Sequence, residues 1–452
     1  MRRISFFIYA LLLVVAASAQ SPKAILEKIS KYPNQAYPIA STYPSVPLGE
    51  IAPAPAGFEP FYFSLVGRHG SRYSQSNKDL RTLLATYRKA DSLAILTDLG
   101  KRFYRKMEEI TAVQEAHLHE LTPLGYNQWV GIGNRAYSNF TPVFEGAIES
   151  KSSKTMRCVM SMVAFNQGLK EGNPRLVVHQ DVQEEEQAIV KPLYSNPDVP
   201  ELALSIHREY RKHGKWLEDR KAWDRNSDCS AFLSKITTDS ERLLKECGAK
   251  RGYRFARHSF RQLLFAENFE MGDRELLNTL FTPEEMYNMY VYNTAFWVHT
   301  ASAIDNDIVA MFASYMRPLI EDIMNGASDA IKGKNPHCAN SRFTHDTYMT
   351  PLFSVMGYEG CVAKSTGDLE TDTTSFNLGE LVSMAANLQI ILYRNKQGKV
   401  LVRSLINERD AYLPIKSKTA PFYTWAEFSN YVEHRLKQLD ATRDRVLKNH
   451  RP

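Results

Sequence analysis

The first part of the chain alternates between strand-like and helix-like patterns of apolar residues. Residues 61–66 are an aromatic and β-branched run of strand length, which ends at Gly67. Three stretches with apolar residues at helical spacing follow, near residues 80–87, 124–132 and 156–164. A short apolar run at residues 176–178 then predicts a second strand. This alternation predicts an α/β protein built from layers of sheet and helix.

The pattern changes between about residue 185 and residue 308, where strand-like runs disappear and charged helical segments dominate. Afterwards a strand, a helix, a hairpin and a final amphipathic helix are predicted at 341–343, 349–356, 387–393 with 399–406, and 425–439. We therefore predict a three-layer α/β/α sandwich core in two parts, residues 20–184 and 309–452. A smaller all-helical cap domain, residues 185–308, is inserted between them.

The N-terminus has the pattern of a secretory signal peptide. Arg2 and Arg3 form a positive region, residues 4–17 are apolar, and Ala17-Ser18-Ala19 supplies the small residues of a cleavage site. A spanning helix needs about 20 apolar residues. We therefore predict that residues 1–19 are removed and that the mature protein is periplasmic or secreted, without stable membrane insertion; an uncleaved anchor is the alternative. Residues 21–55, rich in Pro, Tyr and Ser, are predicted to be an extended lead-in.

The composition narrows the possible classes of protein. With 44% hydrophobic and 23% charged residues the chain is too apolar to be disordered, and 22 glycines and 21 prolines in 452 residues exclude a collagen-like sequence. The net charge of +6 suits an anionic ligand, while export argues against a nucleic-acid partner. Five cysteines leave at least one thiol unpaired within the chain; Cys229 and Cys247 could form a disulfide, but spacing does not fix the pairing. The oligomeric state stays open.

The segment Arg68-His69-Gly70-Ser71-Arg72 directly follows the strand predicted at residues 61–66. In α/β proteins, the loops at the carboxyl ends of strands bind ligands. Guanidinium groups pair with phosphate oxygens and stay charged, and a neutral imidazole can attack phosphorus. Gly70 would let the backbone approach a ligand closely. The segment therefore predicts a phosphate site, with a basic surface loop and an incidental histidine as the alternative.

Three segments, in this order along the chain, resemble the signatures of the histidine phosphatase superfamily in its acid phosphatase and phytase branch. Residues 68–72 resemble the RHGxR signature. Arg157 follows the Ser/Thr-rich residues 152–155, as the second arginine of that family does. His345-Asp346 is similar to the last signature in its His-Asp form. Alone, Arg157 could be a surface residue and His345-Asp346 a structural pair, but together the segments favour a common site.

Within that family, the sequence looks most like the multiple inositol polyphosphate phosphatases. The resemblance rests on Arg72-Tyr73, Arg157-Cys158 and Phe165-x-x-Gly168-Leu169. Two positions depart from that subgroup, because Asp346 stands where it has Ala-Glu and Ser74 replaces a common proline.

The resemblance implies an exported phosphomonoester hydrolase that uses neither a metal nor a cofactor. His69 is expected to be the nucleophile and to form a phosphohistidine, while Asp346 is expected to be the proton donor and then the base for water. Four side chains are expected to hold the phosphate: Arg68, Arg72, Arg157 and His345. The expected substrate is a small anionic phosphorylated molecule, first of all an inositol polyphosphate such as phytate. The alternatives are a broad-specificity acid phosphatase and a non-catalytic periplasmic protein that binds phosphorylated ligands.

Two further clusters give weaker signals. Five cations lie within twelve residues, and they could line a pocket for a polyphosphorylated ligand or form a solvated face: Lys250, Arg251, Arg254, Arg257 and Arg261. His117-x-His119-Glu120 lacks a third ligand at a suitable spacing, so we predict no metal site there.

Overall fold

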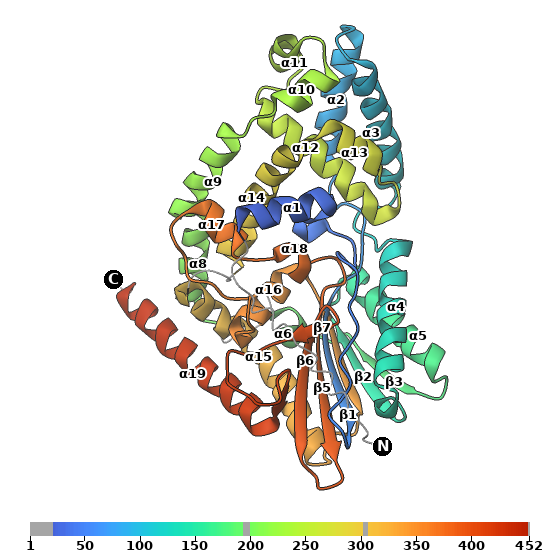
Figure 1. Cartoon of the computed structure of the whole chain (residues 1–452), viewed down its shortest axis with the longest axis vertical. Coiled ribbons are helices and arrows are strands. Elements are labelled where there is room, and N and C mark those ends of the chain that lie inside the picture. The colour runs from blue at the N-terminus through green and yellow to red at the C-terminus, as the bar shows by residue number, and fades with distance from the viewer. Residues whose placement is uncertain (1–20, 193–198, 302–305, 451–452) are drawn as a thin grey trace, which may run out of the picture.

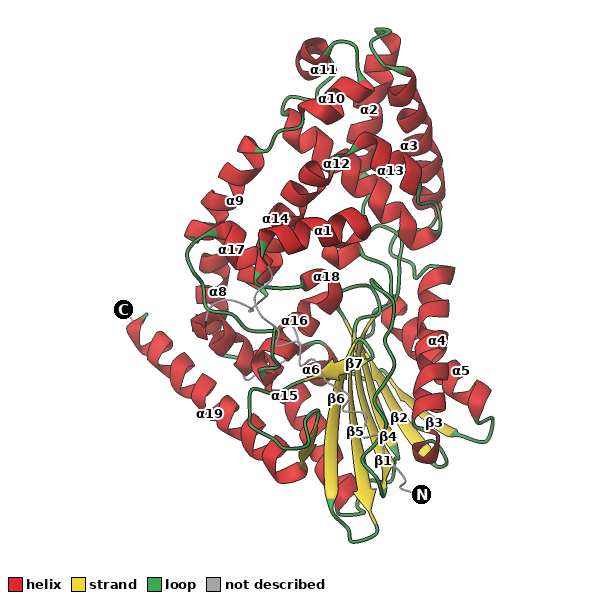
Figure 2. Cartoon of the chain, in the orientation of Figure 1, coloured by secondary structure: helices red, strands yellow, loops and turns green. Residues whose placement is uncertain are grey.

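The structure is a computed structural model that describes residues 21–192, 199–301 and 306–450, so the predicted signal peptide lies outside the described residues. Within these ranges one eight-stranded sheet forms in the order β3-β2-β4-β1-β5-β6-β7, with β8 paired to β6. The strands are β1 Phe58–Arg68, β2 Ala147–Ser152, β3 Val177–Asp181, β4 Ala339–Thr344, β5 Asn387–Asn395, β6 Val400–Ile406, β7 Arg409–Ala411 and β8 Phe422–Thr424. Figure 2 shows the sheet, in yellow, at one end of the molecule.

The middle of the sheet is parallel, and this positions the candidate site. β4 lies between β1 and β2 and is parallel to both, whereas β5 runs antiparallel to β1. In this register Arg68 lies opposite Thr344, and Ser152 lies opposite Phe343. The carboxyl ends of three strands that are far apart in sequence therefore meet at one edge of the sheet.

Helices cover both faces of the sheet. Phe63 and Leu65 of β1 pack in a core with α4 (Pro123–Asn139) and α5 (Met156–Gly172), while Tyr62 and Val66 face a second core. The helices of that second core are α15 (Asn306–Ile331), α16 (Asp346–Met356) and α19 (Trp425–Asn449). This alternation along β1 follows from the two-residue repeat of a strand. The predicted α/β fold with helical layers on both sides is confirmed.

Most of the other helices form a helical region at the opposite end of the long axis (Figure 1). We define it as α1 Pro22–Lys31, α2 Lys78–Ser92, α3 Asp98–Ala116, α9 Lys215–Asn226, α10 Ser230–Ile236, α11 Ser240–Glu246, α12 Gly252–Phe265, α13 Arg274–Leu280 and α14 Pro283–Thr300. Leu80 of α2 and Phe103 of α3 share one core with Phe232 and Phe260. The helical region therefore includes α2 and α3, which precede residue 185, and the division of the chain into domains stays a prediction.

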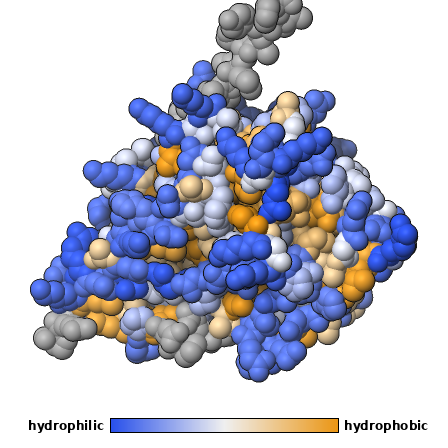
Figure 3. Space-filling model, turned by 90° about the horizontal axis from the view of Figure 1, so that it is seen from below, coloured by the Kyte–Doolittle hydropathy of each residue, from blue (hydrophilic) through white to orange (hydrophobic). Residues whose placement is uncertain are grey.

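Short elements connect these parts. They are the 3-10 turns η1 Pro33–Ala36, η2 Pro38–Ala40, η3 Thr141–Val143 and η4 Ala266–Phe269, and the helices α6 Gln187–Val190, α8 Glu201–His213, α17 Leu369–Thr374 and α18 Leu378–Leu381. None of the described helices is long and apolar enough to cross a bilayer. Seen from the sheet end, the surface is mostly hydrophilic, with hydrophobic residues in small separate patches (Figure 3).

One expectation about local structure was wrong, and one possibility that the sequence left open is decided. Residues 22–31 of the expected extended lead-in form helix α1, because Ser21 caps its N-terminus and Ile25 and Ile29 are buried in the core of the helical region. The disulfide considered between Cys229 and Cys247 is absent, since all five cysteines, each within the described ranges, are free thiols.

Candidate active site

Three loops bring the predicted site residues together. Arg68 ends β1 and leads into the loop at residues 68–72, and Arg157 lies in the first turn of α5. His345 is the N-cap of α16, and Asp346 is the first residue of that helix, directly after β4. Because β1 and β4 are neighbours, all six predicted residues converge, as the contacts below show.

His69 is buried and has a defined orientation. Its Nδ1 lies 2.9 Å from the carbonyl oxygen of Gly70. Because a carbonyl only accepts hydrogen bonds, Nδ1 carries the proton and Nε2 keeps its lone pair. Burial, together with the charges of Arg68 and Arg157, holds the pKa of His69 well below its ordinary value of 6.5. His69 is therefore a neutral imidazole with an available Nε2, which is the form that a nucleophile needs.

Asp346 is held by an arginine of the opposite strand. Nη2 of Arg68 donates to Oδ2 of Asp346 at 2.9 Å, and the backbone N–H of Thr347 donates to Oδ1 at 2.9 Å. Burial raises the pKa of Asp346, but the charges of Arg68 and Arg72 outweigh this effect and hold the pKa below its ordinary value. The carboxyl group is therefore ionised at neutral pH.

Arg68, Arg72 and Arg157 form a group of guanidinium ions with spare donors. Nη1 of Arg68 donates to the carbonyl oxygen of Val382, and Nη1 of Arg72 donates to that of Tyr73, both at 2.9 Å. Burial is the main cause that lowers the pKa of Arg72 to about 10, so it stays charged at neutral pH. Among the described residues, the buried Nε atoms of all three arginines have no hydrogen-bond partner. Phosphate oxygens would supply the missing acceptors.

His345 lies beside His69, with the two rings edge to face and their centroids 5.7 Å apart. Its Nε2 is 3.2 Å from Oγ of Ser153 and 3.4 Å from Oγ1 of Thr155, while Nη2 of Arg157 is 3.4 Å from Nδ1. Burial and the charge of Arg157 lower the pKa of His345 to about 4. Because a guanidinium only donates, Nδ1 accepts from Arg157, and Nε2 carries the ring proton and donates to the hydroxyl of Ser153. His345 therefore links Arg157 to the turn at residues 153–155 and fixes the position of that arginine in the site.

The loop at residues 68–72 is seated on helix α4. A Cβ atom at Gly70 would lie 2.3 Å from the carbonyl oxygen of Gly125, and one at Gly125 would lie 2.1 Å from that of Ser71. Gly70 was expected to let the backbone approach a ligand closely. In the structure, its close approach is made with the N-terminus of α4. The backbone N–H of Gly70 also donates to Oγ of Ser161 on α5 at 3.0 Å.

Ser71 connects this loop to both halves of the molecule. Its backbone N–H donates to Oε1 of Gln128 on α4 at 2.9 Å, and Nε2 of Gln128 donates to its Oγ at 2.9 Å. Oγ of Ser71 then donates to Oδ1 of Asn268 in η4 at 2.8 Å. The position of the loop therefore depends on the helical region as well as on the sheet.

Tyr37 is a residue of the site that the sequence analysis missed. Nη2 of Arg261 on α12 donates to its hydroxyl, and the guanidinium lies 4.6 Å from its ring centroid. Burial dominates the lowered pKa of Arg68 and of Arg72, and the Tyr37 phenol acts on both in the opposite direction, so it lies close to them. No motif marks Tyr37; only its contact with Arg261, more than 200 residues away, identifies it.

The basic stretch that begins at Lys250 divides into two faces of α12. Arg257 is buried, forms an ion pair with Asp224 and lies 3.8 Å from the ring centroid of Tyr292. Arg261 faces Tyr37, whereas Lys250, Arg251 and Arg254 are exposed. The five cations therefore do not form one uniformly solvated face.

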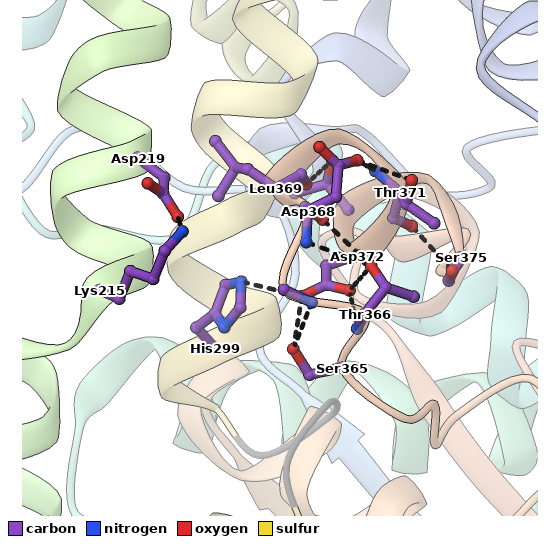
Figure 4. Close-up of polar contacts among 12 residues, drawn as sticks. Lys215, Asp219, His299, Ser365, Thr366, Asp368, Leu369, Thr371, Asp372 and Ser375 are labelled. Atoms are coloured by element: carbon purple, nitrogen blue, oxygen red, sulfur yellow. Dashed lines mark hydrogen bonds and ion pairs between the residues drawn. The ribbon is translucent and has the colours of Figure 1, made fainter.

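A serine, a histidine and an aspartate also meet beside α17 (Figure 4). Oγ of Ser365 donates to Oδ2 of Asp372 at 2.7 Å, and Oγ1 of Thr366 donates to Oδ1 at 2.8 Å. Nε2 of His299 lies 4.0 Å from the same carboxylate. In a serine nucleophile the hydroxyl donates to the histidine, which the aspartate orients. Because Ser365 donates to the carboxylate directly, this cluster anchors a loop to α14 and does not form such a triad.

The site has the parts for transfer of a phosphoryl group: a neutral nucleophile, three cations with spare donors and a carboxyl group beside them. Within the described ranges, no three His, Cys, Asp or Glu side chains are grouped as metal ligands. His117, considered above as a possible ligand, instead lies 2.9 Å from Oε2 of Glu120.

Comparisons with known proteins agree with this geometry. A multiple inositol polyphosphate phosphatase of Bifidobacterium longum, solved in complex with inositol hexasulfate, has a TM-score of 0.68 at 18% identity and covers 87% of this chain and 97% of its own. The phytase from D. castellii has a TM-score of 0.66 at 15% identity, with 89% and 85% covered, and that of Hafnia alvei has 0.52 at 12%, with 86% and 99% covered. These solved structures share the fold.

The family itself is shown by the sequence match. No curated protein matches the chain. A family profile described as the histidine phosphatase superfamily (branch 2) matches residues 63–407, which is well over half of the chain and includes the three segments of the site. The chain therefore belongs to branch 2 of the histidine phosphatase superfamily.

Proposed function

We propose that the protein hydrolyses phosphomonoesters through a phosphohistidine and that inositol polyphosphates such as phytate are its substrates. The observation that carries the proposal is the orientation of His69. Its Nδ1–H is committed to the carbonyl oxygen of Gly70, and its Nε2 belongs to a neutral ring beside three arginines with unpartnered Nε atoms. The arginines would bind the phosphoryl oxygens and stabilise the charge that develops on them.

The reaction has two steps. In the first, Nε2 of His69 attacks phosphorus, the bond between phosphorus and the ester oxygen breaks, and the carboxyl group of Asp346 gives its proton to the departing alkoxide. In the second, the Asp346 carboxylate takes a proton from water, the water oxygen attacks phosphorus, and the bond between phosphorus and nitrogen breaks. Phosphate leaves, and His69 is again neutral.

The lowered pKa of Asp346 decides how the first step obtains its proton. At neutral pH the carboxyl group is ionised and bound to Arg68. A phosphate monoester that binds as its monoanion would bring the missing proton with it. Its remaining negative charge would also offset the arginines, which raises the pKa of Asp346 in the complex. Acidic solution favours both conditions, so we propose an enzyme that works best below neutral pH.

The helical region supports a substrate with several phosphates. Arg261 and Arg257 carry buried Nε atoms that have no partner among the described residues, and Arg261 adjoins Tyr37, which lies near Arg68 and Arg72. The B. longum enzyme, which has a similar fold, was solved with inositol hexasulfate bound. A broad-specificity acid phosphatase is the second candidate, because Asp224 already neutralises Arg257.

Acid-quench labelling tests the mechanism. In Asp346→Asn, a phosphorylated substrate with a good leaving group, such as p-nitrophenyl phosphate, should leave an acid-labile phosphoryl group on His69, because no base remains to activate water. The control Asp346→Asn/His69→Ala should retain no label. A label on any residue other than His69 would contradict the assignment. All steps use protein groups, so a chelator should leave the rate of phosphate release unchanged.

Two substrates separate the candidates. Release of phosphate from both phytate and p-nitrophenyl phosphate supports the proposed specificity, and release from the aryl ester alone favours the general phosphatase. Binding without turnover of either compound would favour the non-catalytic protein for phosphorylated ligands.

We also propose that the protein is exported, as the signal-peptide pattern in residues 1–19 indicates. N-terminal sequencing of the protein from cells should begin at Gln20. A retained Met1 would favour the uncleaved anchor.

A further inference from the structure

A groove between α2 and α12 carries a local excess of positive charge. It has a volume of about 470 Å³ and is open to solvent, and we call it the α2–α12 groove. Its charged and titratable lining consists of Lys78 and Asp79 at the start of α2, and of Lys250, Arg251, Arg254 and His258 at the start of α12. With His258 neutral, these side chains sum to 4 − 1 = +3. Neither the loop at residues 68–72 nor α5 lines this groove.

The cations that line the groove form no ion pairs with acidic side chains in the part of the chain that the structure describes. They are Lys78, Lys250, Arg251 and Arg254. Cations on the neighbouring helix α11 do have such partners, because Arg242 pairs with Glu246 and Lys245 pairs with Glu241. Concentrating unpaired cations around a concavity is unfavourable by itself and becomes favourable when an anion binds.

The end of α12 adds to this preference for anions. The helix has 14 residues and begins at Gly252, and its N-cap residue Arg251 makes no side-chain hydrogen bond to the first turn. The first backbone N–H groups of a helix point away from its body and carry a partial positive charge. Arg251 and Arg254 flank this turn and both line the groove.

The cations Lys250, Arg251 and Arg254 lie at or just before the N-terminal end of α12, away from the residue that adjoins the candidate active site. Arg261 is the residue of α12 that adjoins Tyr37 and the candidate active site. With a rise of about 1.5 Å per residue, Arg254 lies about 10 Å and Arg251 about 15 Å further along the helix axis. His258, one turn from Arg261, also lines the groove, and the three cations lie beyond it. An anion bound to these three cations is therefore centred away from Arg261.

We propose that the α2–α12 groove is a second, non-catalytic binding site for a polyphosphorylated anion, so that one chain holds two such anions at once. The choice of ligand class rests on the proposed function, whereas the site itself rests on the groove and its unpaired cations. Phosphate groups would contact Lys250, Arg251 and Arg254, and Lys78 would close the other end. A ligand held there would raise the local concentration of substrate near the cleft.

Calorimetric titration of the mature chain with inositol hexasulfate, which has no phosphate to hydrolyse, tests the inference. The wild type should bind two molecules. The variant Lys250→Ala/Arg251→Ala/Arg254→Ala should bind one at unchanged affinity and show at least a tenfold loss at the second site. Lys396→Ala/Lys399→Ala/Lys416→Ala removes the same charge from exposed positions elsewhere and should still bind two. Hydrolysis of p-nitrophenyl phosphate, which has a single phosphate, should be the same in all three proteins.

Several results would overturn the inference: a single site or none in the wild type, two sites retained in the groove variant, or equal weakening in both triple variants. Failure of the proposed function gives a different result. A protein that binds two molecules of the hexasulfate but hydrolyses neither p-nitrophenyl phosphate nor phytate would keep the second site and lose the enzyme.

Discussion

At the scale of single residues, the chemistry depends on two groups whose pKa values are lowered for different reasons. Burial and then arginine charges lower the pKa of His69, which keeps the ring neutral into the acid range. For Asp346, burial acts in the opposite direction and the arginines prevail. The nucleophile must be unprotonated and the donor protonated, so both lowered values move the active range toward acid.

We therefore expect the kcat/KM for an alkyl phosphate such as glycerol phosphate to be highest in acid and to fall above neutral pH. The acid limb reports protonation of His69 below its lowered pKa. The fall on the alkaline side reports ionisation of the substrate monoanion, which brings the proton that Asp346 passes to the leaving group. With p-nitrophenyl phosphate the alkaline fall should be weaker, because a phenolate leaves without a full proton transfer. Initial rates between about pH 3 and pH 9 measure both limbs. Equal, flat profiles for the two substrates would contradict the role of Asp346.

A second prediction at the scale of single residues concerns the substitution of Gly125. Because a Cβ at this position overlaps the carbonyl oxygen of Ser71, Gly125→Ala should displace the loop at residues 68–72. We expect a loss of at least tenfold in kcat/KM and a decrease of about 1–3 kcal/mol in the free energy of unfolding. The control is Gly131→Ala on the same helix, where the nearest atom is the flexible end of Arg135 at 3.1 Å. Alanine there should be neutral or stabilising by up to about 1 kcal/mol. Similar losses for both variants would show that the effect is not specific to the loop.

At the scale of elements, β2 is a strand that the pattern of apolar residues does not predict. No strand was predicted from apolar residues at 147–152, yet β2 lies inside the sheet. Apart from Ile148, its buried positions are polar and have polar partners: Oγ of Ser341 donates to Oγ of Ser150 at 2.8 Å, and Lys151 forms ion pairs with Glu186 and Asp322. A strand whose interior contacts are hydrogen bonds and ion pairs has no hydrophobic alternation to detect. The strands with apolar interiors, β1 and the hairpin of β5 and β6, lie where their patterns predicted them.

The prediction at the scale of elements concerns Ser153, which lies in the turn between β2 and α5. Ser153 and Thr155 place hydroxyls against Nε2 of His345, and Ser153→Ala removes the shorter of these contacts. Without it, the ring of His345 and the Arg157 guanidinium that donates to its Nδ1 are held less firmly in the phosphate site. We expect about a fivefold loss in kcat/KM, consistent with about 1 kcal/mol for one hydrogen bond, together with a matching rise in the inhibition constant for inorganic phosphate. The exposed Ser138→Ala is the control. A normal inhibition constant in Ser153→Ala would place the hydroxyl outside phosphate binding.

At the scale of the whole molecule, the chain joins its two halves through contacts that no local pattern encodes. The nucleophile loop can be predicted because it carries several chemically distinctive residues in a row. Arg157 and His345-Asp346 can be predicted only together with that loop, because the three segments resemble the family's signatures in the same order. The N-terminal segment has no such motif. Nδ2 of Asn293 donates to the carbonyl oxygen of Ala36 at 3.1 Å, and the Tyr43 hydroxyl donates to Glu408, so each contact joins residues more than 200 positions apart. Such pairs follow from the assembled fold, and a single sequence does not show them.

Asn268 is the residue on which these long-range connections converge. It is fully buried: its Oδ1 accepts from Oγ of Ser71, and its Nδ2 donates to the carbonyl oxygen of Ala40 at 2.7 Å. Asn268→Ala would leave both partners buried with one hydrogen bond fewer, at a cost of about 1–3 kcal/mol for each group left unsatisfied. We expect a lower melting temperature and, at 25 °C where the variant stays folded, a lower kcat/KM, because the hydroxyl of Ser71 is then held by Gln128 alone. The exposed Asn278→Ala on α13 should change neither quantity. If Asn268→Ala lowers stability but leaves kcat/KM intact, the helical region does not position the nucleophile loop, and Gln128 suffices.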